Sequence, residues 1–147
     1  MKRRPELRDL SEDHHHGLVL ARNARRAASG NASLSVDAAW TEVEVQFAAE
    51  LAPHFEIEEL LIAPGLELAG ESELTQRLFE EHQTLRDCVR PGSGRTAADL
   101  DRFGELLEAH IRWEERELFE MAERRLTGEA LAAIVDACRA NRESRPS

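Results

Sequence analysis

The sequence predicts an all-α protein, an antiparallel up-down-up-down four-helix bundle that ends in a short C-terminal helix. Apolar residues recur with the period of an α-helix, and no segment alternates as a half-buried strand does. Stretches rich in glycine, proline and serine divide the chain into four long helical segments and one short one. The connections between the long segments are short, and helices joined in this way pack as antiparallel neighbours.

The first two helices are expected over residues 10–28 and from about residue 35 to residue 63. A Ser-Gly-Asn stretch ends the first helix. Either Ser35 or Asp37 can cap the second with a side-chain oxygen, and a Pro-Gly pair is expected to end it. Pro53 lies inside the second helix, where it removes a backbone hydrogen bond, so we expect a kink at this point.

The third helix is expected from residue 71 or 72 to residue 89. The fourth is expected to continue to about residue 126, and the last to cover residues 129–140. A Pro-Gly-Ser-Gly stretch separates the third helix from the fourth, and Thr96 can cap the fourth. A Thr-Gly pair precedes the last helix, whose apolar residues form one stripe. The polar tail over residues 141–147 is expected to fray.

The length of 147 residues suits a single domain over residues 1–147, with its core over residues 10–126. A domain of this size buries roughly 70% of the surface that its unfolded chain exposes, so it needs no disulfide bonds. Cys88 and Cys138 lack the spacing of a redox or zinc motif, and both are expected to be free thiols without a functional role.

The net negative charge of the chain disfavours partners that are themselves negatively charged. Acidic residues outnumber Lys and Arg by 29 to 19, which gives a net charge of −10 and disfavours nucleic acid and anionic membranes. No apolar run approaches the roughly 18 residues of a membrane span, and no apolar stretch follows the basic start, so a secretory signal is not expected. We expect a cytoplasmic protein; the sequence identifies no protein partner.

The spacing of the histidines is the main functional signal. They fall into four places, one for each long helix: a cluster at His14, His15 and His16, and single residues at His54, His82 and His110. Glu58 and Glu114 each follow one of these single histidines by four residues, and residues at this spacing share a helix face. Four helices would then direct imidazoles and two carboxylates at one point.

These residue types in this pattern predict a metal site. Each histidine lies within or beside an apolar stripe, where a buried carboxylate is costly unless it is paired or binds a metal. Imidazole with carboxylate suits iron, zinc, manganese or copper. Four histidines and two glutamates exceed the needs of one tetrahedral zinc ion. We therefore predict two metal ions, with Glu58 and Glu114 bridging them.

Two other helical metal motifs are absent. No glutamate precedes the single histidines by three residues, which disfavours the ferritin-like di-iron pattern. The zinc protease motif H-E-x-x-H does not occur either. A metal-free bundle with interhelical histidines is the alternative. Three further acidic residues are expected at the surface, or as partners that orient a ligand histidine through its other nitrogen: Glu59, Glu115 and Glu117.

One phrase on each long helix carries a family resemblance. The four phrases are Ser11-Glu-Asp-His-His-His-Gly-Leu-Val, Pro53-His-Phe-Glu-Ile-Glu-Glu, Glu80-Glu-His-Gln-Thr-Leu-Arg and His110-Ile-Arg-Trp-Glu-Glu-Arg-Glu-Leu-Phe. Together they resemble the hemerythrin-like, or HHE cation-binding, family. The resemblance implies a four-helix bundle that holds two non-haem iron ions in an Fe–O–Fe type centre, with zinc or a mixed metal pair as the alternative.

The resemblance also implies the ligands. The first helix would supply His14, which shares a stripe with Leu10 and Leu18, and His15 is the second choice for this helix. The other helices would supply His54 and Glu58, His82, and His110 and Glu114.

The chain departs from the oxygen carriers of this family at two positions. They have His-x-x-x-His on the third helix, where this chain has Arg86 after His82. They place the carboxylate of the fourth helix five residues after the histidine, whereas Glu114 follows by four and Glu115 occupies the fifth place. The pattern is similar to that of iron-sensing and iron-centre-repair members. We infer that fewer imidazoles leave more open coordination positions, which favours reaction with small oxidants over reversible carriage.

The leading interpretation is a non-haem di-iron protein that binds or senses O2, NO or peroxide, or handles iron. Its partner would be a small diatomic molecule or peroxide. The alternatives are an oxidoreductase that acts on peroxide or NO, and an interaction bundle that the metal stabilises. The sequence leaves open whether the protein is an enzyme.

Overall fold

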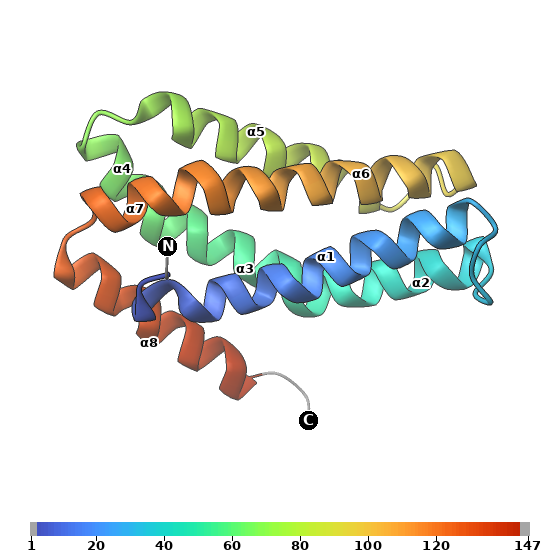
Figure 1. Cartoon of the computed structure of the whole chain (residues 1–147), viewed down its shortest axis with the longest axis horizontal. Coiled ribbons are helices and arrows are strands. Elements are labelled where there is room, and N and C mark those ends of the chain that lie inside the picture. The colour runs from blue at the N-terminus through green and yellow to red at the C-terminus, as the bar shows by residue number, and fades with distance from the viewer. Residues whose placement is uncertain (1–2, 145–147) are drawn as a thin grey trace.

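The computed structural model describes residues 3–144, and every regular element in that range is helical, which confirms the all-α fold. Four long helical stretches are followed by a further helix at the C-terminal end. Figure 1 shows the long stretches side by side, with the last helix beside the start of the first. Within the described range, no helix combines the length and the apolar character that crossing a membrane requires.

The elements have the following bounds. The first stretch is α1 (Arg8–Ala28), preceded by the 3-10 turn η1 (Pro5–Leu7). The second consists of α2 (Val36–Gln46), α3 (Ala52–Ile57) and α4 (Ala63–Leu68), joined by the π-helical turns η2 (Phe47–Leu51) and η3 (Glu58–Ile62). The third is α5 (Ser72–Val89). The fourth consists of α6 (Ala97–Trp113), the π turn η4 (Glu114–Leu118) and α7 (Phe119–Arg125), and the last helix is α8 (Gly128–Ser144).

Two of the π turns accommodate prolines inside the second stretch. In each turn, the residue before the proline donates its N–H to the carbonyl five residues back, Phe47 in the case of Pro53 and Glu58 in the case of Pro64. Proline has no N–H, and its ring would clash with the carbonyl four residues back, so a wider turn lets the helix continue. The expected end of this helix before Pro64 was therefore wrong, and the stretch continues to Leu68.

Side-chain caps begin α2 and α6 at predicted positions, and α8 has a cap that was not predicted. Ser35, rather than Asp37, accepts a hydrogen bond from the first turn of α2. Thr96 forms a capping box with Asp99 at the start of α6. Thr127 Oγ1 accepts a backbone N–H from the first turn of α8 at 3.1 Å. These bonds satisfy amide groups that have no partner inside their own helix.

The C-terminal helix is longer than predicted. It was expected to end at residue 140 with a frayed tail, but it runs to Ser144. In its last turn Arg142 bonds to Asp9 of α1, which holds the end of the helix in place. The rest of the expected tail, residues 145–147, lies outside the described residues. The buried stripe of α8 consists of Leu131, Ile134 and Cys138.

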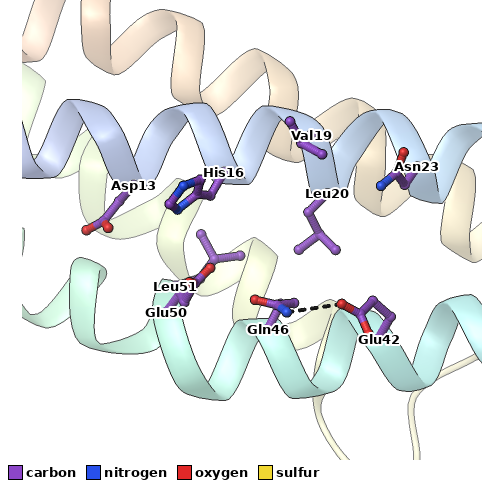
Figure 2. Close-up of a pocket in the computed structure, with 10 residues that line it drawn as sticks. Asp13, His16, Val19, Leu20, Asn23, Glu42, Gln46, Glu50 and Leu51 are labelled. Atoms are coloured by element: carbon purple, nitrogen blue, oxygen red, sulfur yellow. Dashed lines mark hydrogen bonds between the residues drawn. The ribbon is translucent and has the colours of Figure 1, made fainter. Parts of the chain in front are cut away.

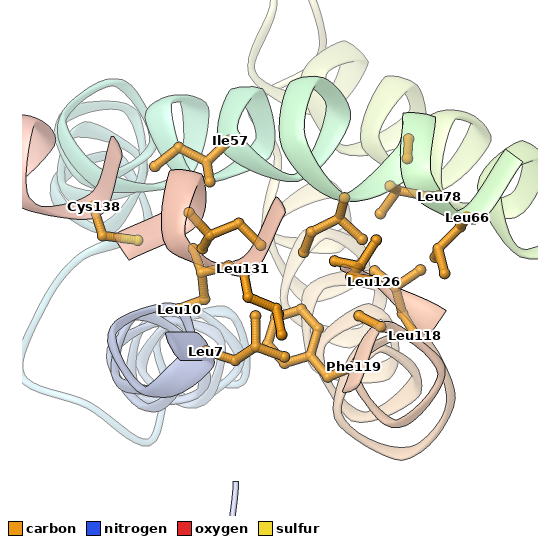
Figure 3. Packing of buried hydrophobic residues seen from close by; sticks show 14 of the residues in the cluster. Leu7, Leu10, Ile57, Leu66, Leu78, Leu118, Phe119, Leu126, Leu131 and Cys138 are labelled. Carbon is orange, nitrogen blue, oxygen red and sulfur yellow. The ribbon is translucent and has the colours of Figure 1, made fainter. Parts of the chain in front are cut away.

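Buried apolar side chains form two clusters along the long helices. The first, shown in Figure 3, joins the ends of the stretches that lie near α8 and includes Leu10, Ile57, Leu78, Leu118 and Phe119. The second lies further along the same helices and includes Leu20, Phe55, Leu85, Leu107 and Ile111. The predicted metal ligands fall between the clusters: His82, for example, lies between Leu78 of the first and Leu85 of the second.

Two glycines allow α1 and α6 to pack closely. A Cβ atom on Gly104 would lie 2.8 Å from the backbone oxygen of Ala21. A Cβ atom on Gly17 would lie 2.7 Å from Ile111 Cδ1. A side-chain tip can move aside, but the backbone of a helix cannot do so cheaply. Gly104 therefore sets the separation of the two helices.

We expect Gly104→Val to lower the free energy of unfolding by about 2 kcal/mol, because overpacking a close helix contact typically costs this much. Urea denaturation of the metal-free protein measures the change. Gly128→Ala is the matched control, since a Cβ atom there meets nothing within 4 Å, and we expect a change of at most about 0.5 kcal/mol. Equal stability of Gly104→Val and the unchanged protein would contradict the close contact.

Candidate metal centre

Six buried side chains meet in one layer between the two apolar clusters. The four histidines are at most 4% exposed and come from four stretches: His14 of α1, His54 of α3, His82 of α5 and His110 of α6. Glu58 and Glu114 are completely buried and are the first residues of the π turns η3 and η4. The structure thus brings together every predicted site residue except His15.

The six side chains form two groups that share both glutamates. His14 and His54 belong to one group, called here the first group, and His82 and His110 belong to the second. In each group, one nitrogen or oxygen atom per residue lies within 4.8 Å of the others. Each group therefore offers two imidazole nitrogens and two carboxylate oxygens to one cation.

Each glutamate directs one oxygen at each group. Glu58 Oε2 lies 3.0 Å from His54 Nε2, and its Oε1 lies 3.0 Å from His82 Nε2. The corresponding distances for Glu114 are 2.6 Å from Oε1 to His14 Nε2 and 2.9 Å from Oε2 to His110 Nε2. Both carboxylates thus lie between the two groups, with one oxygen toward each.

A ring of four outer carboxylates surrounds the histidines. Each imidazole directs Nε2 inward and places Nδ1 against one of these carboxylates. The contacts are Glu115 to His14 (2.6 Å), Asp13 to His54 (3.1 Å), Glu59 to His82 (2.7 Å) and Glu81 to His110 (2.7 Å). A carboxylate at Nδ1 favours the tautomer in which Nδ1 carries the proton, so that the Nε2 lone pair faces the centre.

The outer ring links the helical stretches in a closed cycle. Asp13 of the first stretch contacts the histidine of the second, and Glu59 of the second contacts the histidine of the third. Glu81 of the third contacts the histidine of the fourth, and Glu115 of the fourth contacts the histidine of the first. Each stretch therefore orients a ligand of the next one.

Sequence reasoning found only part of the outer ring. Glu59 and Glu115 were anticipated as partners of a histidine, whereas Asp13 and Glu81 were missed. The available signal was adjacency, because every outer carboxylate is the chain neighbour of a central residue. Glu117, which was expected either at the surface or as such a partner, is exposed.

His15 does not reach the centre. It was kept as the second choice on the first helix, but it is exposed, as is His16. One step along an α-helix rotates the side chain by roughly 100°, so only His14 shares the inward face. Cys88 and Cys138 are free thiols outside both groups.

Several cavities border the outer ring. One of about 310 Å³ lies between α1 and the second stretch, and Figure 2 shows Asp13 and His16 on one side of it and Glu50 on the other. The second, of about 120 Å³, lies between α5 and α6 and is lined by Glu81 and His110. The first cavity thus borders the outer carboxylate Asp13, whereas the second borders both an outer carboxylate, Glu81, and its histidine, His110.

The surrounding carboxylates favour protonated histidines when no metal is bound. Burial lowers the pKa of His82, but the neighbouring carboxylates, Glu114 foremost, outweigh this effect and raise the pKa to about 10. Burial also lowers the pKa of His110, and the charge of Glu114 raises it to about 9. Against the same effect of burial, neighbouring carboxylates raise the pKa values of His14 and His54.

The residues fit a bound metal. Four buried atoms at the centre lie close to one another without forming a hydrogen bond of good geometry: His82 Nε2, His110 Nε2, Glu58 Oε1 and Glu114 Oε2. All four belong to the second group. Buried polar atoms without a partner are costly, and a cation bound to nitrogen and oxygen donors of this kind satisfies all four together.

The family assignment follows from a comparison over most of the chain. The model of the hemerythrin HHE cation-binding domain matches residues 6–122. The chain belongs to this family. The matched residues include all six central side chains of this hemerythrin-like domain and all four outer carboxylates. Comparison with curated proteins and with solved structures found no match.

The raised histidine pKa values predict how the stability of the metal-free protein depends on pH. An unfolded imidazole titrates near 6.5, whereas the folded pKa values reach about 9 for His110 and about 10 for His82. The stabilisation is therefore complete below pH 6.5 and is lost as the pH rises toward 10. We expect the melting temperature of EDTA-treated protein to fall over this range.

The metal-loaded protein is the control for this measurement. A bound metal keeps Nε2 deprotonated, so we expect its melting temperature to change less between pH 6.5 and 10 than that of the metal-free protein. A melting temperature of the metal-free protein that rises with pH would contradict the predicted protonation.

The different positions of His14 and His15 predict opposite outcomes for two neighbouring substitutions. We expect His14→Ala to weaken metal binding in the first group at least tenfold. Removal of a residue that only orients a ligand already weakens metal binding by about this factor. His15→Ala removes an exposed imidazole from the same helix, so its metal content and affinity should match the unchanged protein. Competition with a chromogenic chelator measures both, and equal losses in the two variants would contradict this placement.

Proposed function

We propose that this protein is a non-haem di-iron protein that binds or senses O2, NO or peroxide, or handles iron. The donor set is the observation that carries the proposal. Each group offers two imidazoles together with carboxylate oxygens. Two imidazoles and a carboxylate are the ligands of non-haem iron sites that keep coordination positions open for a small molecule.

The six central residues would divide between two iron ions. His14 and His54 would hold one ion, and His82 and His110 the other. Glu58 and Glu114 would contact both ions, since each directs one oxygen at each group. Iron held in this way would supply electrons to a small oxidant or bind it directly.

The side chains around the centre support a small ligand. Phe55 stacks on His82 with ring centroids 3.8 Å apart, and Phe119 stacks on His14 at 4.9 Å. These buried rings fix the imidazole planes and exclude bulk water, which strengthens electrostatic interactions at the centre. The smaller cavity, beside His110, has a volume of about 120 Å³. This size suits a diatomic molecule or peroxide rather than a bulky substrate.

We also infer that the four long stretches run antiparallel, up-down-up-down, around the centre. The connections between them are short, over residues 29–35, 69–71 and 90–96. Short connections of this kind join antiparallel neighbours. The contacts of α1 with α2 and α6, and of α5 with α6, support the same order.

We expect protein purified anaerobically under iron-replete conditions to contain two iron atoms per chain. Iron binds the folded state only, so a ligand concentration 100-fold above its dissociation constant should stabilise the protein by about 2.7 kcal/mol. Elemental analysis and thermal melts of the iron-loaded and metal-free forms measure these effects. Addition of NO, azide or peroxide should then change the visible absorption spectrum of the iron-loaded protein.

The control is Glu58→Gln, which keeps the size of the side chain but removes the charge of one bridging carboxylate. It should reduce the iron content and the spectral response together. Iron well below one atom per chain in the unchanged protein would refute the proposal. Two irons without any response to the three small molecules would refute the ligand class alone.

A further inference from the structure

Arg86 occupies the position one turn after His82 on α5, and its side chain contacts the outer ring. Its two terminal nitrogens donate to both oxygens of Glu59, Nη1 to Oε2 at 2.9 Å and Nη2 to Oε1 at 3.1 Å. A paired contact of this kind between guanidinium and carboxylate is stronger and more directional than a single hydrogen bond. Arg86 therefore fixes the plane of the Glu59 carboxylate.

The outer carboxylate that Arg86 holds is the one that orients His82. Glu59 Oε2 also contacts His82 Nδ1 at 2.7 Å, so this oxygen accepts from both side chains. Since Glu59 comes from the second stretch and the other two residues from α5, the three side chains also connect these stretches.

A second contact links Arg86 to the same imidazole through an aromatic ring. The guanidinium carbon lies 5.6 Å from the centroid of Phe55. Phe55 in turn stacks on His82, with centroids 3.8 Å apart and an interplanar angle of 11°. The ring of His82 is therefore held at its edge by Glu59 and on its face by Phe55, and Arg86 contacts both of these residues.

Two other arginines each contact an outer carboxylate through a single nitrogen. Arg77 contacts Glu81 through Nε alone, at 2.7 Å, and Arg3 contacts the Glu115 carboxylate through Nη2 alone, at 3.2 Å. Arg77 and Arg3 thus leave their carboxylates more freedom to rotate than Arg86 leaves Glu59.

We propose that Arg86 is a positioning residue that sets the geometry of the second group by fixing His82 through Glu59 and Phe55. The inference rests on the proposed metal centre and adds a residue that does not touch the metal. The guanidinium group of Arg86 thus helps to hold His82, the imidazole of α5, in place. Loss of Arg86 should therefore alter the second group while leaving the fold intact, since its side chain is a third exposed (32%).

Titration with cobalt(II) tests the proposal, because its visible absorption bands report ligand geometry. We expect Arg86→Gln to weaken cobalt binding roughly tenfold, the lower end of the range for groups that orient a ligand, and to shift the absorption bands. The cobalt affinity of Arg86→Lys should fall between those of Arg86→Gln and the unchanged protein, since an ammonium group cannot reproduce the two-nitrogen contact. Arg112→Gln is the matched control: it removes the same charge from an exposed pair with Glu108 on α6.

A double substitution tests the route through Glu59. If Arg86 acts through this carboxylate, adding Arg86→Gln to Glu59→Gln should weaken binding by at most about twofold more, because residues in one network are not additive. A full additional tenfold loss would overturn the proposed route. Cobalt affinity and bands of Arg86→Gln that equal those of the unchanged protein would overturn the positioning role, as would equal losses in Arg112→Gln.

The outcomes also separate this inference from the metal centre itself. If the unchanged protein binds neither cobalt nor iron, both the proposed function and the role of Arg86 are refuted. If it binds metal and Arg86→Gln behaves identically, only the role of Arg86 is refuted. Thermal melts of the metal-free variants show whether they fold; if Arg86→Gln does not, the same comparison of affinity and bands in Arg86→Lys decides the question.

Discussion

The structure depends on the burial of two carboxylates side by side at its centre. Glu58 and Glu114 are completely buried, and a charge in such a place needs compensation by opposite charge or by a metal. Four imidazoles, one from each long stretch, supply the groups that compensate them. The outer carboxylates then orient these imidazoles, and arginines hold three of the outer carboxylates, so the polar contacts extend from the centre to the surface.

This polar layer also constrains how the helices pack. It separates two apolar clusters, and each cluster must place its helices at the distance that the layer requires. Gly104 permits the close approach of α1 and α6, and the π turns η3 and η4 begin at the two buried glutamates themselves. A π turn inserts an extra residue and locally changes the direction of the following side chains.

The sequence predicted the parts of this arrangement that depend on a single helix. A histidine and a glutamate four residues apart share a face in any α-helix, so His54 with Glu58 and His110 with Glu114 followed directly from spacing. The caps at Ser35 and Thr96 are equally local. The contacts of Asp13 and Glu81 were not predictable in this way, because each crosses to another stretch. The continuation past Pro64 depends on a π turn, which helical periodicity does not reveal.

Charge balance explains how one layer can suit both a metal-free and a metal-loaded state. The raised pKa values favour protons on the histidines of the metal-free protein, and four such protons add four positive charges to the layer. Two divalent cations that replace these protons add the same charge. The net charge of the layer would therefore be the same with four histidine protons as with the proposed metal pair. Metal binding would then be an exchange of protons for metal cations, and we expect its affinity to depend on pH because protons compete for the same Nε2 atoms.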